Sequence, residues 1–165
     1  MQSEHQLSLF QKVLLATDGT VTDLIALYYE EPIRVIKLEQ SVRLEASPAE
    51  LACDKATRIL RRTILLSGAV KIYMHAESGF VFDRMSPWLQ EQMLSTDLPV
   101  GLLWKQARLE TFREMLGSSV GSREAIAPLF GLSESEPFVS RSYRIHHAGK
   151  PLGMISETWP LSYFR

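Results

Sequence analysis

The chain has 165 residues, of which 45% are hydrophobic and 22% are charged, and this is the composition of an ordinary folded protein. Its length predicts that residues 1–165 form a single domain. The 18 Lys and Arg residues nearly balance the 19 Asp and Glu residues, so the basic surplus of a nucleic-acid-binding protein is absent. We therefore expect no nucleic-acid partner.

The sequence offers little for disulfide, metal or membrane chemistry. It has one cysteine, Cys53, and no Cys/His cluster with the spacing of a zinc site. The N-terminus lacks a signal-peptide pattern, and no window reaches the roughly 18 apolar residues of a membrane span. We expect a cytoplasmic protein without a membrane span or metal, in which Cys53 is a buried or incidental thiol.

The first elements predicted are a short apolar run and a helix. The apolar run at residues 13–16 is a candidate for an additional strand. A turn at residues 18–20 precedes apolar residues that recur at helical spacing. We expect Thr20 to be the N-cap, Asp23 to complete a short capping box, and Pro32 to stop the helix.

Alternating strands follow this helix. Residues 33–46 alternate between apolar and polar side chains, as in a half-buried strand. Residues 57–66 and 70–78 form two further strand candidates. Only Ser67-Gly68-Ala69 separates them, which predicts a tight hairpin.

The middle of the chain is predicted to be helical. Ser86-Pro87 is typical of a helix start, with serine as N-cap and proline at the first helical position. Residues 97–99 interrupt this helix, and a second short helix is expected over residues 100–109. The glycine- and serine-rich residues 117–121 predict a flexible loop.

The last predicted elements form a second hairpin. Strands at residues 137–147 and 151–159 flank Ala148-Gly149-Lys150. Hairpin connections imply antiparallel pairing. The expected architecture is therefore α+β, with a single mostly antiparallel sheet of five to six strands and helices over one face.

Two charged residues lie on the apolar sides of predicted strands. Arg62 shares its side with leucines and an isoleucine, whereas Arg61 points the other way. Glu157 lies on the same side as Ile155 and Trp159. Because an unpaired charge that faces a core costs several kcal/mol, each residue needs a compensating partner.

Two interpretations of Arg62 and Glu157 remain open at this point. In the first, the two side chains simply pair with each other, or the strand face has been wrongly assigned. In the second, they line a pocket. A buried guanidinium presents a fork of donors suited to a carboxylate, and a partly desolvated glutamate has a raised pKa that lets it donate or shuttle a proton. The second interpretation predicts a pocket for a small anion that bears a hydroxyl or ether away from its carboxylate.

Other polar residues are weaker candidates. His146 and His147 lie beside a hairpin turn without a third ligand, so we expect an exposed pair rather than a metal site. His75 is expected on a solvated face, as is Glu77 unless a strand twist turns it inward. Residues 18–20 lack the spacing of a phosphate-binding loop, although the free N–H groups after this turn are donors for a carboxylate.

A series of short segments resembles the chorismate lyase family, and most closely its divergent branch of 4-hydroxybenzoate synthases. These segments are LATDGTVT at residues 15–22, RRTILL at 61–66, HAES at 75–78, LPVG at 98–101, RSYRI at 141–145 and ETWP at 157–160. Each segment is short, but together they cover nearly the whole chain in order.

The resemblance implies a carbon–oxygen lyase that eliminates pyruvate from chorismate to leave 4-hydroxybenzoate, without a metal or organic cofactor. It implies a pocket closed by helix-turn-helix flaps, in which the essential arginine that binds the ring carboxylate falls on Arg62. The essential glutamate near the ring oxygen falls on Glu157, and the flap positions that contact the ligand fall on Val21 and Val100. Small Ala76 leaves room for the ligand, and the product of this family feeds quinone or phenolic-lipid synthesis.

The chain also departs from the family pattern. Better-known members have Gly-Arg where this chain has Ala76-Glu77, and a Glu77 carboxylate would alter the charge of the pocket if it faced inward. The same fold occurs in UTRA domains, which sense effectors in bacterial regulators without catalysis and normally follow a winged helix-turn-helix. Only a short polar stretch precedes the first apolar run here. The alternative is therefore a non-catalytic domain that binds a small aromatic acid.

Overall fold

Alternating apolar and polar residues joined by tight turns form one antiparallel sheet in the computed structural model, which describes residues 6–165. The elements in chain order are α1 (Leu9–Ala16), α2 (Val21–Tyr29), β1 (Arg34–Glu45), β2 (Thr57–Ser67), β3 (Ile72–Val81), α3 (Pro87–Ser95), α4 (Val100–Gln106), β4 (Phe112–Ser122), β5 (Pro137–His147) and β6 (Lys150–Pro160). Short 3₁₀ helices occur at Ala49–Leu51, Phe82–Arg84 and Ala127–Phe130. The first five residues, part of the N-terminal stretch without a signal pattern, lie outside the described residues.

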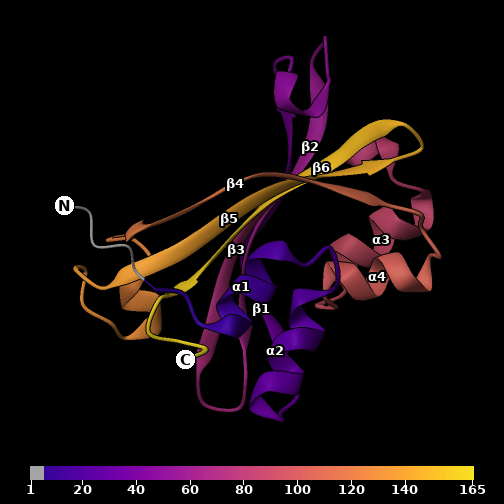
Figure 1. Ribbon diagram of the computed structural model, residues 1–165. Helices are drawn as coiled ribbons and strands as arrows, with labels where there is room; N and C mark the ends of the chain where they lie inside the picture. Colours follow the sequence, from indigo (N-terminus) through magenta and orange to yellow (C-terminus); the bar gives the residue numbers. More distant parts are fainter. Residues whose placement is uncertain (1–5) are drawn as a thin grey trace.

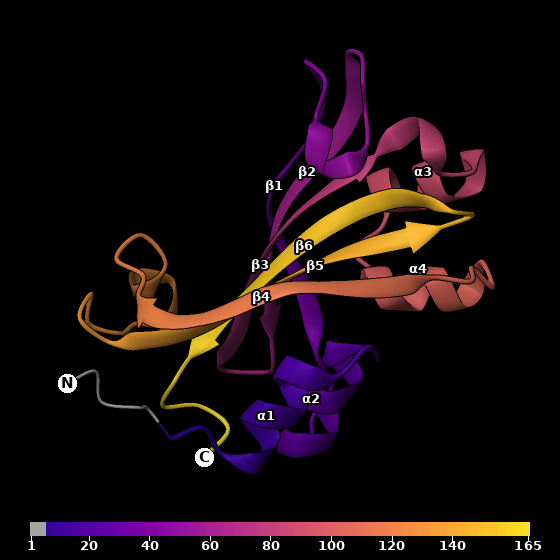
Figure 2. The same cartoon turned by 45° about the horizontal axis from the view of Figure 1, so that its top comes forward.

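The sheet and its helices form two layers. The six strands are ordered β1-β2-β3-β6-β5-β4, and each neighbouring pair is antiparallel. Helices α1 and α2 pack against one half of a sheet face, and α3 and α4 pack against the other half of the same face (Figures 1 and 2). The predicted α+β fold with helices over one face is confirmed.

The sixth strand is not the one that the sequence suggested. The apolar run at residues 13–16 belongs to helix α1, which begins with a capping box between Ser8 and Gln11. A run of four apolar residues does not distinguish a strand from a helix. The sixth strand is β4, which contains the expected loop at residues 117–121 and pairs with β5 over its whole length. Glycine and serine disfavour strands by propensity, but the ladder to β5 overrides that preference.

Helix α2 starts where the sequence predicts, although its capping differs. Thr20 is the N-cap residue, but its side chain makes no capping hydrogen bond. Asp23 does not complete a capping box, because its carboxylate pairs with Lys105 of α4 at 2.8 Å. The helix ends at Glu30, which adopts a left-handed conformation with φ of 54° just before Pro32.

The turn between β5 and β6 sets the register of the functional strands. Ala148 and Gly149 occupy the two loop positions with φ values of 50° and 74°. Positive φ at both positions is the pattern of a type I′ turn, whose twist matches that of the flanking strands. The tight turn places His147 opposite Lys150, and a one-residue register shift between Ile145 and His146 then brings Arg141 opposite Glu157.

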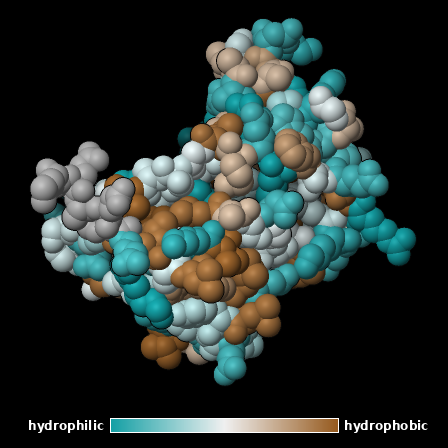
Figure 3. All heavy atoms as spheres, viewed as in Figure 1, coloured by the Kyte–Doolittle hydropathy of each residue, from teal (hydrophilic) through white to brown (hydrophobic). Residues whose placement is uncertain are grey.

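The hydrophobic core consists of two main clusters on the helix-covered face. One cluster joins α1 and α2 to the sheet around Ile25 and Trp159, and the other joins α3 and α4 to it around Leu89 and Phe80. A third, smaller cluster near the projecting β1–β2 hairpin buries Cys53. Exposed hydrophobic side chains gather over α1 and α2, whereas the tip of the hairpin is mainly hydrophilic (Figure 3). None of the helices within residues 6–165 is long and apolar enough to cross a membrane.

Gln11 ties α1 to the C-terminal segment, and we expect its removal to destabilise the fold. Its buried Nε2 donates to the carbonyl oxygens of Leu161 at 2.7 Å and Tyr163 at 2.8 Å. Replacing Gln11 with leucine leaves both carbonyls unsatisfied, so we expect Gln11→Leu to lose about 2–4 kcal/mol of unfolding free energy in urea. The neighbouring exposed variant Lys12→Ala is the control, and a loss below about 1 kcal/mol in Gln11→Leu would contradict this role.

Candidate functional site

The site is built on two neighbouring rows of residues that run across the middle of the sheet. Each row is a set of directly paired positions on β2, β3, β6 and β5, and both rows face the helices. One row contains Ile64, Ala76, Glu157 and Arg141; the other contains Arg62, Ser78, Ile155 and Tyr143. These central rows lie between the two main hydrophobic clusters, so their polar groups are shielded from solvent on both sides.

A pocket of about 60 Å³ lies over the central rows. Its floor comes from the sheet, and its roof comes from the first turns of α2 and α4. All five residues selected from the sequence line this one pocket: Val21, Arg62, Ala76, Val100 and Glu157. These five residues, which are far apart in the sequence, therefore converge on one pocket.

Arg62 is a buried cation that forms no ion pair within residues 6–165. Its side chain is 3% exposed, its Nη1 lies 3.8 Å from Met93 Sδ, and its Nε has no hydrogen-bond acceptor. The nearest acidic influence comes from Asp97, whose carboxylate pairs with Lys37 at 3.5 Å instead. Burial lowers the pKa of Arg62 to about 10, which is the direction expected when a cation is desolvated without compensation.

Glu157 is paired, but not with Arg62. Its Oε2 accepts from Arg141 Nε at 2.7 Å, and its Oε1 accepts from the hydroxyl of Tyr143 at 3.0 Å. The interpretation in which Arg62 and Glu157 pair with each other is therefore wrong. Both carboxylate oxygens of Glu157 thus accept hydrogen bonds from buried side chains.

The two partners of Glu157 are themselves buried. Arg141 is 1% exposed, donates from Nη1 to the Thr17 carbonyl at 2.9 Å, and keeps an unpaired Nη2. Burial and the adjacent carboxylate raise the pKa of Tyr143, so its hydroxyl remains a donor. Sequence reasoning missed both residues as site candidates. The available signal was the alternation of Val139, Arg141, Tyr143 and Ile145, which puts another arginine on an apolar side.

The two flaps over the pocket contact each other. A Cβ atom on Gly101 would lie 2.9 Å from the Thr20 side chain, so any larger residue at this position would require the Thr20 side chain to shift. Lys105 and Asp23 form an exposed ion pair across the same junction at 2.8 Å. Arg113 of β4 donates from Nη1 to the carbonyl of Gly19, just before α2, at 2.8 Å. The structure thus shows the flaps in a closed arrangement.

Several of the weaker candidates lie outside the pocket. Glu77 is exposed and lines a groove on the opposite sheet face, where Arg61 pairs with Glu45. Glu77 therefore does not face inward. His75 is also on that side but is 4% exposed rather than solvated, and burial lowers its pKa.

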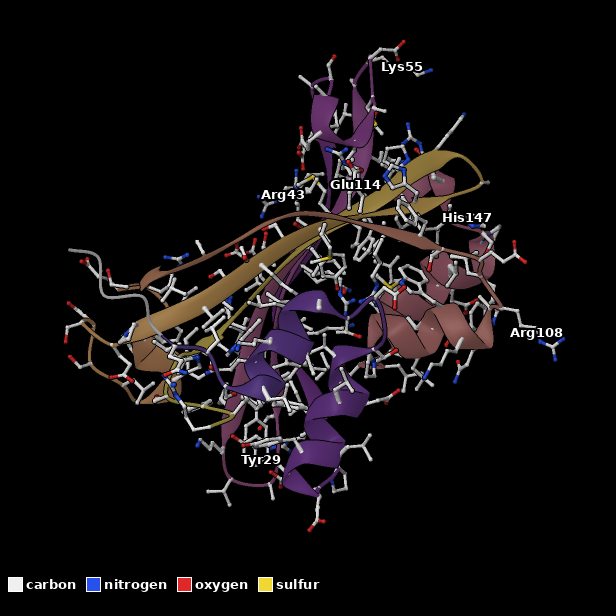
Figure 4. The ribbon with its side chains drawn as sticks, viewed as in Figure 1. Tyr29, Arg43, Lys55, Arg108, Glu114 and His147 are labelled. Carbon is white, nitrogen blue, oxygen red and sulfur yellow. The ribbon has the colours of Figure 1, made fainter. Side chains whose placement is uncertain are left out.

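The two histidines near the second hairpin bind protein groups. His146 lies 2.8 Å from Glu114 Oε2, and His147 lies 2.9 Å from the carbonyl oxygen of Glu110. Figure 4 shows Glu114 and His147 well separated, along the β4 and β5 side of the molecule. Within residues 6–165, no group of three His, Cys, Asp or Glu side chains is placed to hold a metal ion.

Comparison with known proteins connects this site to a family of lyases. The family model described as chorismate pyruvate-lyase Rv2949c-like matches residues 15–165. The chorismate pyruvate-lyase of Mycobacterium leprae is 30% identical over 159 residues, which cover 93% of this chain and 75% of the relative. The chorismate pyruvate-lyase of Mycobacterium tuberculosis H37Rv is 26% identical over 162 residues, covering 93% of this chain and 81% of the relative.

Solved structures with the same fold include PhnF and its effector domain. PhnF from Mycobacterium smegmatis has a TM-score of 0.71 at 12% identity, and the match covers 88% of this chain and 65% of PhnF. The effector domain of PhnF alone has a TM-score of 0.69 at 12% identity, covering 86% of this chain and 88% of that domain. At this identity the likeness shows a shared fold and nothing about activity.

We expect the unpaired charge of Arg62 to reduce the stability of the ligand-free protein. Arg62→Met keeps a similar volume and removes a buried cation that has no counter-charge, so we expect it to raise the unfolding free energy in urea by about 1–3 kcal/mol. The matched control is Arg61→Met, on the same strand and the opposite face, which removes a half-exposed pair with Glu45 and is expected to change stability by less than about 1 kcal/mol. A clear loss of stability in Arg62→Met would show that the guanidinium is compensated in the free protein.

Proposed function

The chain belongs to the Rv2949c-like chorismate pyruvate-lyase family, and we propose that it eliminates pyruvate from chorismate to give 4-hydroxybenzoate. The observation that carries this proposal is the buried guanidinium of Arg62, which faces the pocket without a carboxylate partner among the residues described. A buried cation is stable only when an anion completes its environment. We propose that the carboxylate of a small ring compound is this anion.

In the proposed complex, Arg62 binds the ring carboxylate of chorismate through its fork of N–H donors. The first turn of α2, at Val21 and Thr22, adds backbone N–H groups that have no partner within the helix. Ala76 forms the small-residue floor beneath the ring, and Val100 covers it from α4. The ring is thus held between the sheet and both flaps.

The proposed reaction balances without a co-reactant. The bond between a ring carbon and the ether oxygen breaks, and the hydrogen on the adjacent ring carbon moves to the methylene carbon of the departing group. That group leaves as pyruvate, and the ring becomes aromatic. Because aromatisation supplies the driving force, the protein needs mainly to position the side chain over that hydrogen, and we propose that it does so without a metal or organic cofactor.

Glu157 and the positive charge of the pocket serve the transition state. Glu157 accepts a hydrogen bond from the ring hydroxyl, and Arg141 and Tyr143 fix the position of its carboxylate. The departing oxygen gains negative charge in the transition state. The pocket lining stabilises this charge, because it contains two cations, Arg62 and Arg113, and one anion, Glu157. Preorganised charges in a water-poor pocket lower the barrier without rearranging during the reaction. By resemblance to the family, we propose that the product supplies quinone or phenolic-lipid synthesis.

A second candidate function uses the same pocket without catalysis. The fold is shared with the effector domain of PhnF, so the architecture alone does not distinguish an enzyme from a ligand-binding domain. In this alternative, Arg62 binds the carboxylate of a small aromatic acid, and the complex is stable because no bond is broken.

We expect purified, EDTA-treated protein to form 4-hydroxybenzoate and pyruvate from chorismate in equal amounts, beyond one equivalent per protein. Arg62→Gln and Glu157→Gln are expected to lower kcat/KM by about 100-fold or more. Arg62→Gln removes a positive charge that stabilises the departing oxygen, and Glu157→Gln replaces the charged acceptor for the ring hydroxyl with a weaker neutral one. The measurement is product formation at substoichiometric protein, followed by absorbance and a coupled pyruvate assay.

Arg61→Gln is the matched control and is expected to retain wild-type turnover, since its side chain lies on the opposite face. Wild-type turnover in both the Arg62→Gln and Glu157→Gln variants would reject the assigned roles. No product from the wild-type protein, together with a melting temperature raised by 4-hydroxybenzoate, would favour the non-catalytic binding domain.

A further inference from the structure

A second cavity, between the flaps and β4, adjoins the buried pocket. This outer cavity has a volume of about 380 Å³ and shares four lining residues with the inner pocket. The shared residues are Thr20, Gly101, Trp104 and Arg113. Because ligand pockets in proteins usually span roughly 300–1,000 Å³, the inner pocket of about 60 Å³ is too small alone for a ring with a long substituent. A ligand with its ring inside therefore extends a substituent toward the outer cavity.

Arg113 is a second unpaired cation at this junction. It is half-buried, its guanidinium carbon lies 4.9 Å from the Tyr143 ring centroid, and its Nη1 donates to the Gly19 carbonyl. Across residues 6–165, no carboxylate forms an ion pair with it, and only one of its five N–H donors has an acceptor. Arg113 is therefore able to hold Gly19 and bind an anion at the same time.

Trp104 adds an unpaired donor beside Arg113. The side chain is 5% exposed, and its buried Nε1 has no hydrogen-bond partner in the described part of the chain. Trp104 lines both cavities, and a buried indole N–H without an acceptor carries a cost that a ligand or water acceptor would remove. The junction thus combines a free cation and a free neutral donor.

We propose that Arg113, assisted by the indole N–H of Trp104, binds the second carboxylate of chorismate, the one on the enolpyruvyl group. This proposal rests on the proposed function and deepens it. Chorismate has two carboxylates, and the lining of the pocket has two cations without carboxylate partners, Arg62 and Arg113. Arg62 takes the carboxylate on the ring, and Arg113 takes the one on the substituent that leaves.

The arrangement makes Arg113 a specificity residue for substrate over product. 4-Hydroxybenzoate has only the ring carboxylate, so it contacts Arg62 and loses the contact with Arg113. The hydrogen bond from Arg113 to Gly19 also connects the substituent to the start of the α2 flap, so the dicarboxylate favours the closed arrangement more than the product does. Pyruvate is then released through the outer cavity.

Other cations near the outer cavity do not fit this role. Lys105 is paired with Asp23 at 2.8 Å. Arg108 is exposed, and Figure 4 shows its side chain extending away from the body of the protein. Arg108 lines the outer cavity but not the inner pocket, which makes it a matched control for Arg113.

The test compares two ligands in the full-length variants Arg113→Gln, Arg113→Lys and Arg108→Gln. The quantities are KM for chorismate and Kd for 4-hydroxybenzoate, with thermal unfolding to verify that each variant is folded. We expect Arg113→Gln to raise KM for chorismate by about 10- to 100-fold, as for loss of one charge-assisted contact, while Kd for 4-hydroxybenzoate stays within about threefold. We expect Arg113→Lys to restore part of the loss, and Arg108→Gln to leave both constants within about threefold.

Three results would overturn the proposal. An unchanged KM for chorismate in Arg113→Gln would show that Arg113 does not bind the second carboxylate, and the proposed lyase function would still stand. An equal loss of affinity for chorismate and for 4-hydroxybenzoate would show that Arg113 only holds the α2 flap in place. If the wild-type protein neither binds nor converts chorismate, the proposed function itself fails, and the role of Arg113 fails with it.

Discussion

The central constraint on this structure is a guanidinium that is buried without a counter-charge. Arg62 lies in the middle of a sheet face, between two hydrophobic clusters that stabilise the fold on either side. Because each cluster joins its own helix pair to the sheet, the gap between them is free to hold polar groups at little cost to the rest of the core. Under the proposed function, this destabilising charge lies where the carboxylate of the ligand would compensate it.

The remaining polar groups of the pocket follow from this placement. Glu157 lies one row away from Arg62 but forms its ion pair with Arg141. The positive charge of Arg62 is therefore not cancelled by Glu157. Register alone keeps the two apart, since Arg62 is paired with Ser78 and Glu157 with Ala76. The effector domain of PhnF has the same fold at 12% identity, so the fold by itself does not identify what this pocket does.

The sequence predicts much of this structure because its strongest signals are local. Hairpin turns and the alternation of apolar and polar residues predict every strand except β4. The same alternation identifies Arg62 and Glu157 as charged residues on the apolar sides of their strands. Strand β4 was missed because its glycines and serines carry no apolar pattern, and only the ladder to β5 makes it a strand. Arg141 was missed as the partner of Glu157 because the pairing depends on the register between β5 and β6, which composition does not reveal.

The central claim is that Arg62 is reserved for a ligand carboxylate, and a thermodynamic cycle tests it most directly. Calorimetry would measure the binding of 4-hydroxybenzoate and of its uncharged analogue 4-hydroxybenzamide to the wild-type protein and to Arg62→Met. We expect the benzoate to bind the wild-type protein at least about 30-fold more tightly than the amide, and this preference to disappear in Arg62→Met, a coupling of about 2 kcal/mol or more. A preference for the benzoate that is the same in both proteins would contradict the claim, because the carboxylate would then be recognised elsewhere.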